Sequence, residues 1–181
     1  SDHDGLGRIE TNAEQIKSFV LRVLKECGTD KVNIIAHSKG GLDTLYMIDR
    51  LGMTSCVASV TFLCTPHKGS IVATKLYSMW RPLRSVVAFF LNFWYRIFGD
   101  KHPDAVGVCR ELRATRDSVV ECFDHHDGVF MQSYSCRLDR TRDDFVMGIP
   151  LMFHRRYEDV PTDGLVSVES SKFRNYKGHV G

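Results

Sequence analysis

The feature that most constrains the fold is a strand, a tight turn and a helix between Lys31 and Leu51. Val32–Ala36 is apolar and rich in β-branched residues, which predicts a short buried strand. From Leu42 to Leu51 the apolar residues recur at helical spacing, so a helix is expected soon after the turn. A second buried strand is predicted over Val57–Cys64. Helices and strands that alternate at this spacing predict a mostly parallel sheet with flanking helices.

The turn itself has the pattern small-x-Ser-x-Gly, with Ala36 at the first small position and Ser38 at its centre. This pattern is typical of a nucleophile elbow, in which the crowded strand and helix backbones require small flanking residues. The hydroxyl of Ser38 would stand clear of the sheet edge, and the backbone N–H of Lys39 would point to where an oxyanion forms. The sequence therefore predicts Ser38 as a nucleophile and Lys39 as an oxyanion donor. A chance match between a strand and a helix is the alternative.

Composition narrows the classes of function. The chain has 181 residues, enough for one domain with a sizeable core, and its net charge is only +2. No cluster of Lys and Arg is present, so no nucleic-acid partner is expected. The six cysteines show no CxxC spacing and no paired histidines, which argues against a zinc site. Because Cys56 and Cys64 border an apolar strand, buried free thiols are favoured over a disulfide framework.

The start of the chain predicts a loop followed by a helix. Residues 1–7 are polar and glycine-rich, with neither an initiating methionine nor a targeting segment, so an internal piece of a longer protein is expected. The compartment stays open, with secretion and the cytoplasm both compatible. Thr11 and Glu14 form a capping-box pattern that predicts a helix from Thr11, ending at Cys27-Gly28.

An unusually apolar segment follows the second strand, from Lys75 to Gly99. It is too short, and too often interrupted by polar residues and proline, to be a transmembrane segment. One interpretation is a pair of buried core helices. The other is a helical cap over residues 75–103, whose apolar face contacts a lipid surface transiently or holds an acyl chain. Its position directly after a loop at a strand end favours the cap.

The remaining elements are predicted from apolar periodicity. A helix is expected over Pro103–Phe123, and strands are expected over Val129–Ser135 and Asn175–Gly181. Phe145–Phe153 is apolar and is interpreted as a second piece of cap, broken by Pro150.

Three segments together resemble a known family. They are Val32–Gly41, Thr65–Ser70 and Thr162–Ser167, in this order along the chain. The chain resembles the triacylglycerol lipase-like group of bacterial α/β-hydrolases. The resemblance implies one partial α/β-hydrolase domain over residues 1–181. It also implies hydrolysis of carboxylic esters of glycerol or simpler alcohols, a lipid or ester as substrate, and no metal or organic cofactor.

The resemblance assigns Asp163 as the acid of a Ser-acid-His triad, and the order along the chain agrees with this fold. An acid at a later strand end can orient an imidazole and stabilise its charged form. The alternative for Asp163 is a turn residue, because Thr-Asp-Gly also favours a turn. His37 is expected to pack beside its strand, and His67 to shape the pocket wall, with a surface histidine as the other interpretation.

Two parts of the catalytic machinery are not found in the sequence. His179 is the only histidine after Asp163, and it lies within the last predicted strand. The base is therefore expected beyond Gly181, and the second oxyanion donor upstream of Thr11. The predicted function is that of a serine carboxylic-ester hydrolase. An acyltransferase or thioesterase with the same triad, and a non-catalytic binding protein on this scaffold, remain alternatives.

Overall fold

The computed structural model describes residues 7–97, 104–113, 128–142 and 145–180. Its helices are α1 (Ile9–Cys27), α2 (Lys39–Arg50), α3 (Ile71–Ser78), α4 (Arg81–Ile97), α5 (Ala105–Glu111), α6 (Phe145–Arg155) and α7 (Val168–Ser171), with a 3-10 turn η1 (Thr54–Cys56). Its strands are β1 (Val32–His37), β2 (Val57–Leu63), β3 (Phe130–Cys136) and β4 (Tyr176–Val180).

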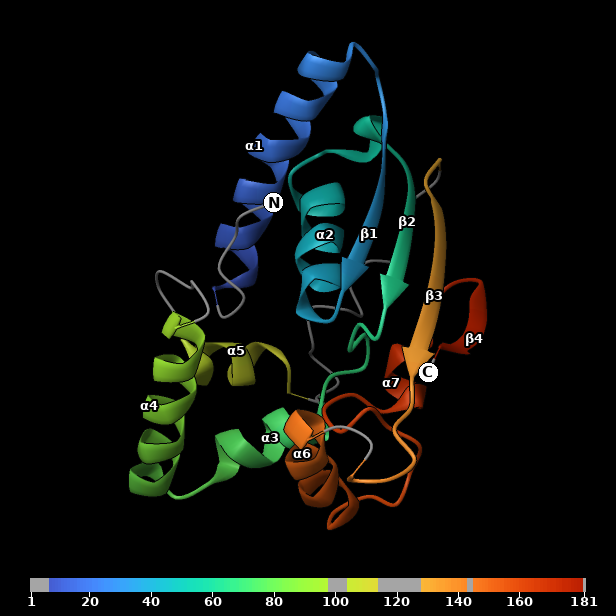
Figure 1. The fold of residues 1–181 in the computed structure, drawn as a ribbon. Helices are drawn as coiled ribbons and strands as arrows, with labels where there is room; N and C mark the ends of the chain where they lie inside the picture. The colour runs from blue at the N-terminus through green and yellow to red at the C-terminus, as the bar shows by residue number, and fades with distance from the viewer. Residues whose placement is uncertain (1–6, 98–103, 114–127, 143–144, 181) are drawn as a thin grey trace.

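The four described strands form one parallel sheet in the order β1-β2-β3-β4. Each strand pairs with the next one along the chain, and β1 is aligned with β2 up to the pair His37 and Leu63. Because all the strands run the same way, their carboxyl ends meet at one edge of the sheet (Figure 1). The predicted parallel sheet with flanking helices is confirmed, and the predicted strands and first helices lie within a few residues of their expected bounds.

One face of the sheet carries the core. Helices α1 and α2 pack against each other and over this face (Figure 1). The buried core draws on α1, α2, β2 and the start of β3, and includes Ile16, Leu45, Ile48, Val60, Phe62 and Met131. The other face is open among the described residues, with the side chain of Ile35 75% exposed. The prediction of a buried first strand was therefore wrong: among the described strands β1 lies at the end of the sheet, and only one of its faces is covered.

The start of α1 differs from the prediction. The helix begins at Ile9 and not at Thr11, and its N-cap residue Arg8 makes no side-chain capping bond. Ile9 is buried in the core, and its backbone N–H donates to the carboxylate of Glu111 at 3.2 Å. A distant carboxylate therefore takes the place of the predicted capping box. The predicted end of the helix, at Cys27 before Gly28, is confirmed.

The prediction of free thiols was wrong for Cys64 and correct for Cys56. Cys64 and Cys136 form a disulfide between the carboxyl ends of β2 and β3. They are 72 residues apart in sequence, and only the pairing of these two strands brings them together. Cys27, Cys56 and Cys109 are free thiols.

The segment after β2 forms helices at the carboxyl-end side of the sheet. Helix α3 contacts α5 and α6, and α4 extends along the flank of the molecule (Figure 1). Of the predicted helix over Pro103–Phe123, the structure describes α5, and residues 114–127 lie outside the described residues. The predicted break at Pro150 was wrong, because α6 continues through it. Leu151 and His154 in its second half are both buried, so packing outweighs the lost backbone hydrogen bond.

Candidate active site

Ser38 occupies the tight turn between β1 and α2 in a conformation that non-glycine residues rarely adopt. Its φ is 51° and its ψ is −133°. The backbone is held there by hydrogen bonds on both sides: the Ser38 N–H donates to Leu63 O at 2.8 Å, and the Gly41 N–H donates to Ser38 O at 3.0 Å. Such a conformation costs on the order of 1–3 kcal/mol and persists only where its surroundings impose it. It is the backbone geometry expected of a nucleophile elbow.

Gly41 explains how closely the turn is packed. A Cβ atom at this position would lie 2.1 Å from Thr65 Oγ1 and 2.9 Å from Thr65 Cβ. The first turn of α2 therefore rests directly on the loop that follows β2, and no larger residue fits there. A Cβ at the neighbouring Gly40 would meet nothing within 4 Å among the described residues. Of the two glycines, Gly41 is the one that packing requires.

Lys39 presents its backbone, and not its ammonium group, to the turn. The side chain is buried and pairs with Asp43 at 2.8 Å, and the same carboxylate accepts a hydrogen bond from Asn12 Nδ2 at 3.0 Å. An N–H at the first position of a helix has no acceptor within that helix. The Lys39 amide is thus the first N–H of α2 and directly follows Ser38.

Asp163 lies half-buried in the loop between α6 and α7. Its Oδ1 accepts the backbone N–H groups of Leu165 and Val166, each at 2.8 Å. Burial raises the pKa of this carboxyl, while the two N–H bonds and the fields of His37 and His154 act in the opposite direction. Neither hydrogen bond uses Oδ2, so this oxygen can accept an imidazole N–H. His37, the residue before Ser38, acts to lower the pKa of Asp163. The loop Thr162–Ser167, called the acid loop from here on, therefore lies near the nucleophile elbow.

The acid loop is held from two sides. Gly164, with φ of 108°, packs against the backbone of α6, where a Cβ would lie 2.9 Å from Met147 O. On the other side, Ser70 Oγ donates to Leu165 O at 2.6 Å, and Ser170 Oγ donates to Gly69 O at 2.6 Å. The segments Thr65–Ser70 and Thr162–Ser167 therefore hydrogen-bond to each other through Ser70 and Leu165.

His67 is buried and is not a surface residue, and its predicted place in a pocket wall stays a prediction. Its side chain is almost fully buried, stacks on Phe173 with ring centroids 4.3 Å apart and meets Phe62 edge-on at 4.9 Å. Burial lowers its pKa to about 3, so the imidazole stays neutral. Neither ring nitrogen has a hydrogen-bond partner among the described residues. The surface alternative for His67 is excluded.

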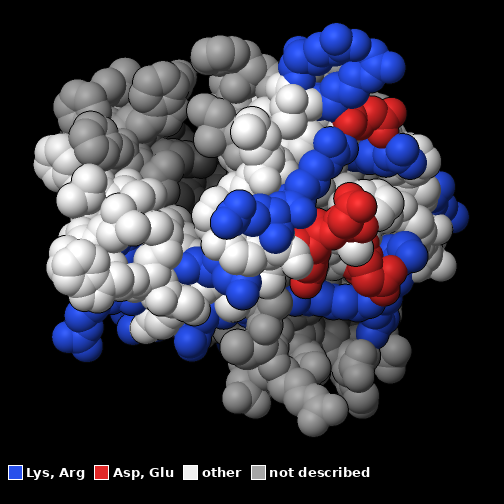
Figure 2. Space-filling model, turned by 90° about the horizontal axis from the view of Figure 1, so that it is seen from below, with Lys and Arg blue, Asp and Glu red and all other residues white. Residues whose placement is uncertain are grey.

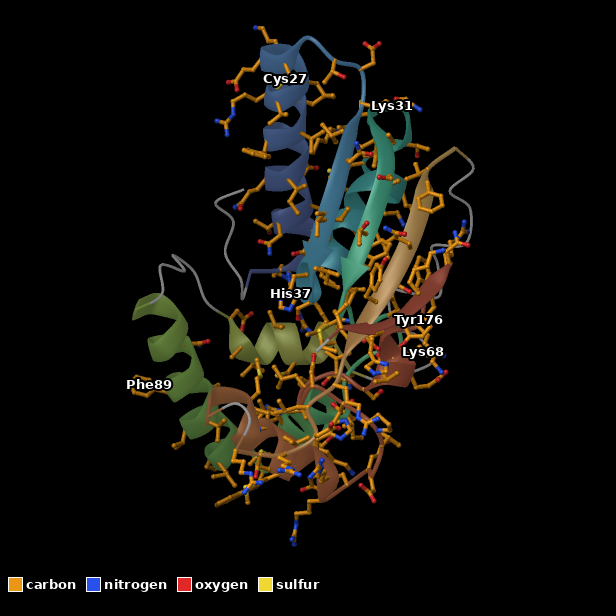
Figure 3. All side chains as sticks on the ribbon, turned by 45° about the vertical axis from the view of Figure 1, so that its right-hand side comes forward. Cys27, Lys31, His37, Lys68, Phe89 and Tyr176 are labelled. Atoms are coloured by element: carbon orange, nitrogen blue, oxygen red, sulfur yellow. A yellow bond between two sulfur atoms is a disulfide. The ribbon has the colours of Figure 1, made fainter. Side chains whose placement is uncertain are left out.

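The sequence predicted the positions of the other described histidines to different degrees. His37 is exposed at the end of β1, at the sheet edge (Figure 3), and does not pack beside its strand as expected. His179 lies in β4, where it pairs with Ser135, as the sequence predicted. The sequence offered no prediction for His154, a buried histidine on α6 that acts to lower the pKa of Asp163. Its only signal was its position three residues after Leu151, on the same side of an apolar helix.

No described histidine hydrogen-bonds to Ser38 or Asp163, so the part of the chain that the structure describes does not contain a positioned base. The same residues contain no group of three or more His, Cys, Asp or Glu side chains that could hold a metal ion. None of the described helices combines the length and the apolar character needed to cross a membrane.

The chain is similar to curated lipases. It is 34% identical over 114 residues to a triacylglycerol lipase of Pseudarthrobacter phenanthrenivorans, a match that covers 59% of this chain and 35% of that protein. A triacylglycerol lipase of Burkholderia plantarii matches at the same identity over 59% of this chain and 31% of its own length. Triacylglycerol lipase 2 of Saccharomyces cerevisiae is 24% identical over 96% of this chain and 52% of its own length. The matches thus span only about a third to a half of these relatives. No known protein-family profile matches the chain.

Solved structures show the same fold. A lipase of Bacillus licheniformis in its mature form superposes with a TM-score of 0.61 at 21% identity, over 94% of this chain and 64% of that one. A metagenomic carboxyl esterase superposes with a TM-score of 0.68 at 16% identity, over 99% of this chain and 51% of that one. The chain is therefore similar to triacylglycerol lipases over part of their length, and it has the α/β-hydrolase fold.

Proposed function

We propose that this chain carries the nucleophile and the acid of a serine carboxylic-ester hydrolase of the lipase or esterase type. The observation that carries the proposal is the strained backbone of Ser38, with φ of 51°, at the sheet edge where the loop of Asp163 is anchored. Backbone strain of this kind is concentrated at active sites and ligand-binding sites. The lipases among its relatives support an ester as the substrate.

The reaction proceeds by acyl transfer in two steps. Ser38 Oγ gives its proton to a histidine and attacks the ester carbonyl carbon, and the Lys39 N–H stabilises the oxyanion. The alcohol leaves with the proton that the histidine returns to it. Water then attacks the acyl-enzyme by the same route, which releases the carboxylic acid and restores Ser38. Asp163 Oδ2 accepts the histidine N–H and stabilises the imidazolium. The histidine and a second oxyanion donor are expected outside the described residues.

The helices after β2 act as the cap of this site. Within residues 75–103, the described part comprises the end of α3 and all of α4, and α6 adds a second piece that packs on the acid loop through Gly164. Exposed apolar side chains on α4 suit a transient contact with a lipid surface.

Hydrolysis of p-nitrophenyl esters from butyrate to palmitate by the intact protein tests the proposal. Ser38→Ala and Asp163→Asn are each expected to lower kcat by on the order of 10⁴-fold or more, because the triad acts as a unit. Asp139→Asn is the matched control, since this exposed carboxylate pairs with Arg137, two residues earlier in the chain.

Full activity in either triad variant would contradict the proposed mechanism. If activity were lost on esters with acyl chains longer than butyrate, the lipid-facing cap would be contradicted. Such a result would still be compatible with a short-chain esterase. Transfer of the acyl group to an added alcohol in preference to water would indicate an acyltransferase, and preference for thioesters a thioesterase.

A further inference from the structure

Helix α2 begins with a buried ion pair directly after the nucleophile elbow. Lys39, the first residue of the helix, and Asp43, one turn later, are 6% and 1% exposed, and Lys39 Nζ lies 2.8 Å from Asp43 Oδ1. The other carboxylate oxygen of Asp43 accepts a hydrogen bond from Asn12 Nδ2 on α1 at 3.0 Å. The two charges therefore lie where α1 packs on α2 (Figure 1).

Charged side chains of a folded protein normally stay in water. Figure 2 shows this arrangement on the face below the carboxyl ends of the strands, where Lys, Arg, Asp and Glu stand at the surface. The pairs Lys68–Glu169 and Arg137–Asp139 are also exposed at both partners. The pair at the start of α2 differs from them, so its position calls for an explanation.

The stability of the helix does not explain the pair. An ammonium group in the first turn lies at the positive end of the helix dipole, where a carboxylate is favoured. For charges four residues apart, the acid stabilises a helix more when it precedes the base, and here Lys39 precedes Asp43. Burial also removes both charges from water, and apolar side chains of similar volume commonly serve a fold as well or better. A role in the neighbouring site is the alternative.

The elbow supplies such a role. The Lys39 N–H has no acceptor within the helix, and the proposed mechanism uses it to stabilise the oxyanion. Such a donor is effective only at the position where the negative charge develops, so its residue has to be held there. The Lys39 ammonium is bonded to Asp43 one turn further along α2, and Asn12 ties the same carboxylate to α1. Lys39 is thus fixed at the far end of its side chain as well as by its backbone.

A second carboxylate lies near this pair. Burial raises the pKa of Glu111, at the end of α5, while the charge of Lys39 lowers it and the charge of Asp43 raises it. One oxygen of Glu111 accepts the Ile9 N–H at 3.2 Å, at the start of α1. If Asp43 alone lost its charge, the buried ammonium could pair with Glu111 instead. A decisive variant must therefore remove both charges of the pair.

We propose that Asp43, with Asn12 bonded to it, is a positioning residue for ester hydrolysis. It holds the Lys39 side chain along α2 and so keeps the Lys39 N–H where the oxyanion forms. Asp43 acts through Lys39 and takes no part in the transfer of the acyl group. The inference rests on the proposed function, because acyl transfer at Ser38 is what gives the Lys39 N–H an oxyanion to bind.

Hydrolysis of p-nitrophenyl butyrate by the intact protein tests the inference, with kcat, KM and the thermal midpoint measured for each variant. Lys39→Met with Asp43→Leu removes both charges and leaves neither group buried without its partner. Asp49→Leu with Arg50→Met is the matched control, because it removes an ion pair of 3.2 Å at the other end of the same helix. Lys39→Arg keeps a cation opposite Asp43.

The double change at Lys39 and Asp43 should lower kcat about tenfold and leave KM unchanged, because the oxyanion forms only when the ester carbonyl is attacked. This loss is smaller than the one expected when an oxyanion donor is removed altogether. The thermal midpoint should not fall, since apolar side chains can replace a buried ion pair. Lys39→Arg should lower kcat less than the double change, and the control should behave like the parent protein.

An unchanged kcat in the double variant would overturn the inference, even with a lower thermal midpoint, since the pair would then serve only the fold. A higher KM at unchanged kcat, or an equal loss of kcat in the control, would overturn it as well. A parent protein that hydrolyses no ester would contradict the proposed function, and the inference would fall with it. If the parent is active and the double variant is as active, the inference alone fails.

Discussion

At the scale of single residues, the site depends on a backbone conformation of Ser38 that is strained for any residue with a side chain. The φ of 51° combined with a ψ of −133° is accessible mainly to glycine. The elbow pattern in the sequence predicted this position because small residues flank the serine. The sequence could not give the hydrogen bonds that hold it, since Leu63 lies on the neighbouring strand.

Replacing Ser38 by glycine should stabilise the fold while removing the nucleophile. We expect Ser38→Gly to be more stable than Ser38→Ala by about 1 kcal/mol, because both lack the hydroxyl and only glycine relieves the strain. Urea unfolding of the two variants measures the difference. Equal free energies of unfolding would mean that Ser38 is not strained.

Gly41 and Gly40 form a matched pair for the packing of the elbow. Gly41→Ala should lower the free energy of unfolding by about 1–3 kcal/mol, because the new methyl group overlaps Thr65, including its Cβ. Gly40→Ala should be neutral or stabilising, since a helix favours alanine over glycine and the position is open. Denaturant unfolding of both variants measures this. Similar losses for the two would contradict the close contact between α2 and the loop after β2.

Because of the buried His67, we expect the free energy of unfolding to decrease in acid. The pKa of this imidazole is about 3 when folded and about 6.5 when exposed, so the unfolded chain binds the extra proton between these values. The free energy of unfolding should therefore fall as the pH drops from about 6.5 towards 3, at up to about 1.4 kcal/mol per pH unit. His67→Phe, which preserves the ring contacts, should flatten this slope.

His179→Gln is the control for the pH experiment, because it removes an exposed histidine on β4 and leaves the buried His67 in place. Unfolding free energies measured across this pH range would contradict the account if His67→Phe retained the full slope of the parent.

At the scale of elements, apolar periodicity predicted the strands and most helices because one face of each packs on the core. The predictions were wrong where a residue far away in the sequence determines the local structure. Glu111 caps α1 in place of a local box, and packing of α6 against the acid loop outweighs Pro150. The open side of β1, with Ile35 exposed, likewise depends on neighbours and not on the strand's own composition.

The disulfide Cys64–Cys136 couples two of these elements. It closes a loop of 72 residues that includes α3, α4 and α5 and joins the strand ends beside the site. Cys64→Ser with Cys136→Ser should lower the free energy of unfolding by about 2–4 kcal/mol, since the open chain regains conformational freedom. Cys27→Ser with Cys56→Ser is the control, because both thiols are free. An unchanged midpoint for the first pair would show that the bond adds no stability.

At the scale of the whole molecule, the parallel sheet brings distant segments to one edge. Ser38 follows β1, the loop Thr65–Ser70 follows β2, and Asp163 lies in the loop that α6 and Ser70 hold in place. Short motifs in the sequence predicted Ser38 as the nucleophile, and the family resemblance implied Asp163 as the acid; both assignments stay predictions. The sequence could not predict the hydrogen bonds between the loops or the buried His154, because these contacts join residues far apart in the chain.

The most direct test of the central claim is to label the intact protein with a fluorophosphonate and to map the modified peptide by mass spectrometry. We predict one serine adduct at Ser38, lost in Ser38→Ala, strongly slowed in Asp163→Asn and unaffected in Asp139→Asn. An adduct on another serine, or no adduct at all on the folded protein, would contradict the assignment of Ser38 as the nucleophile.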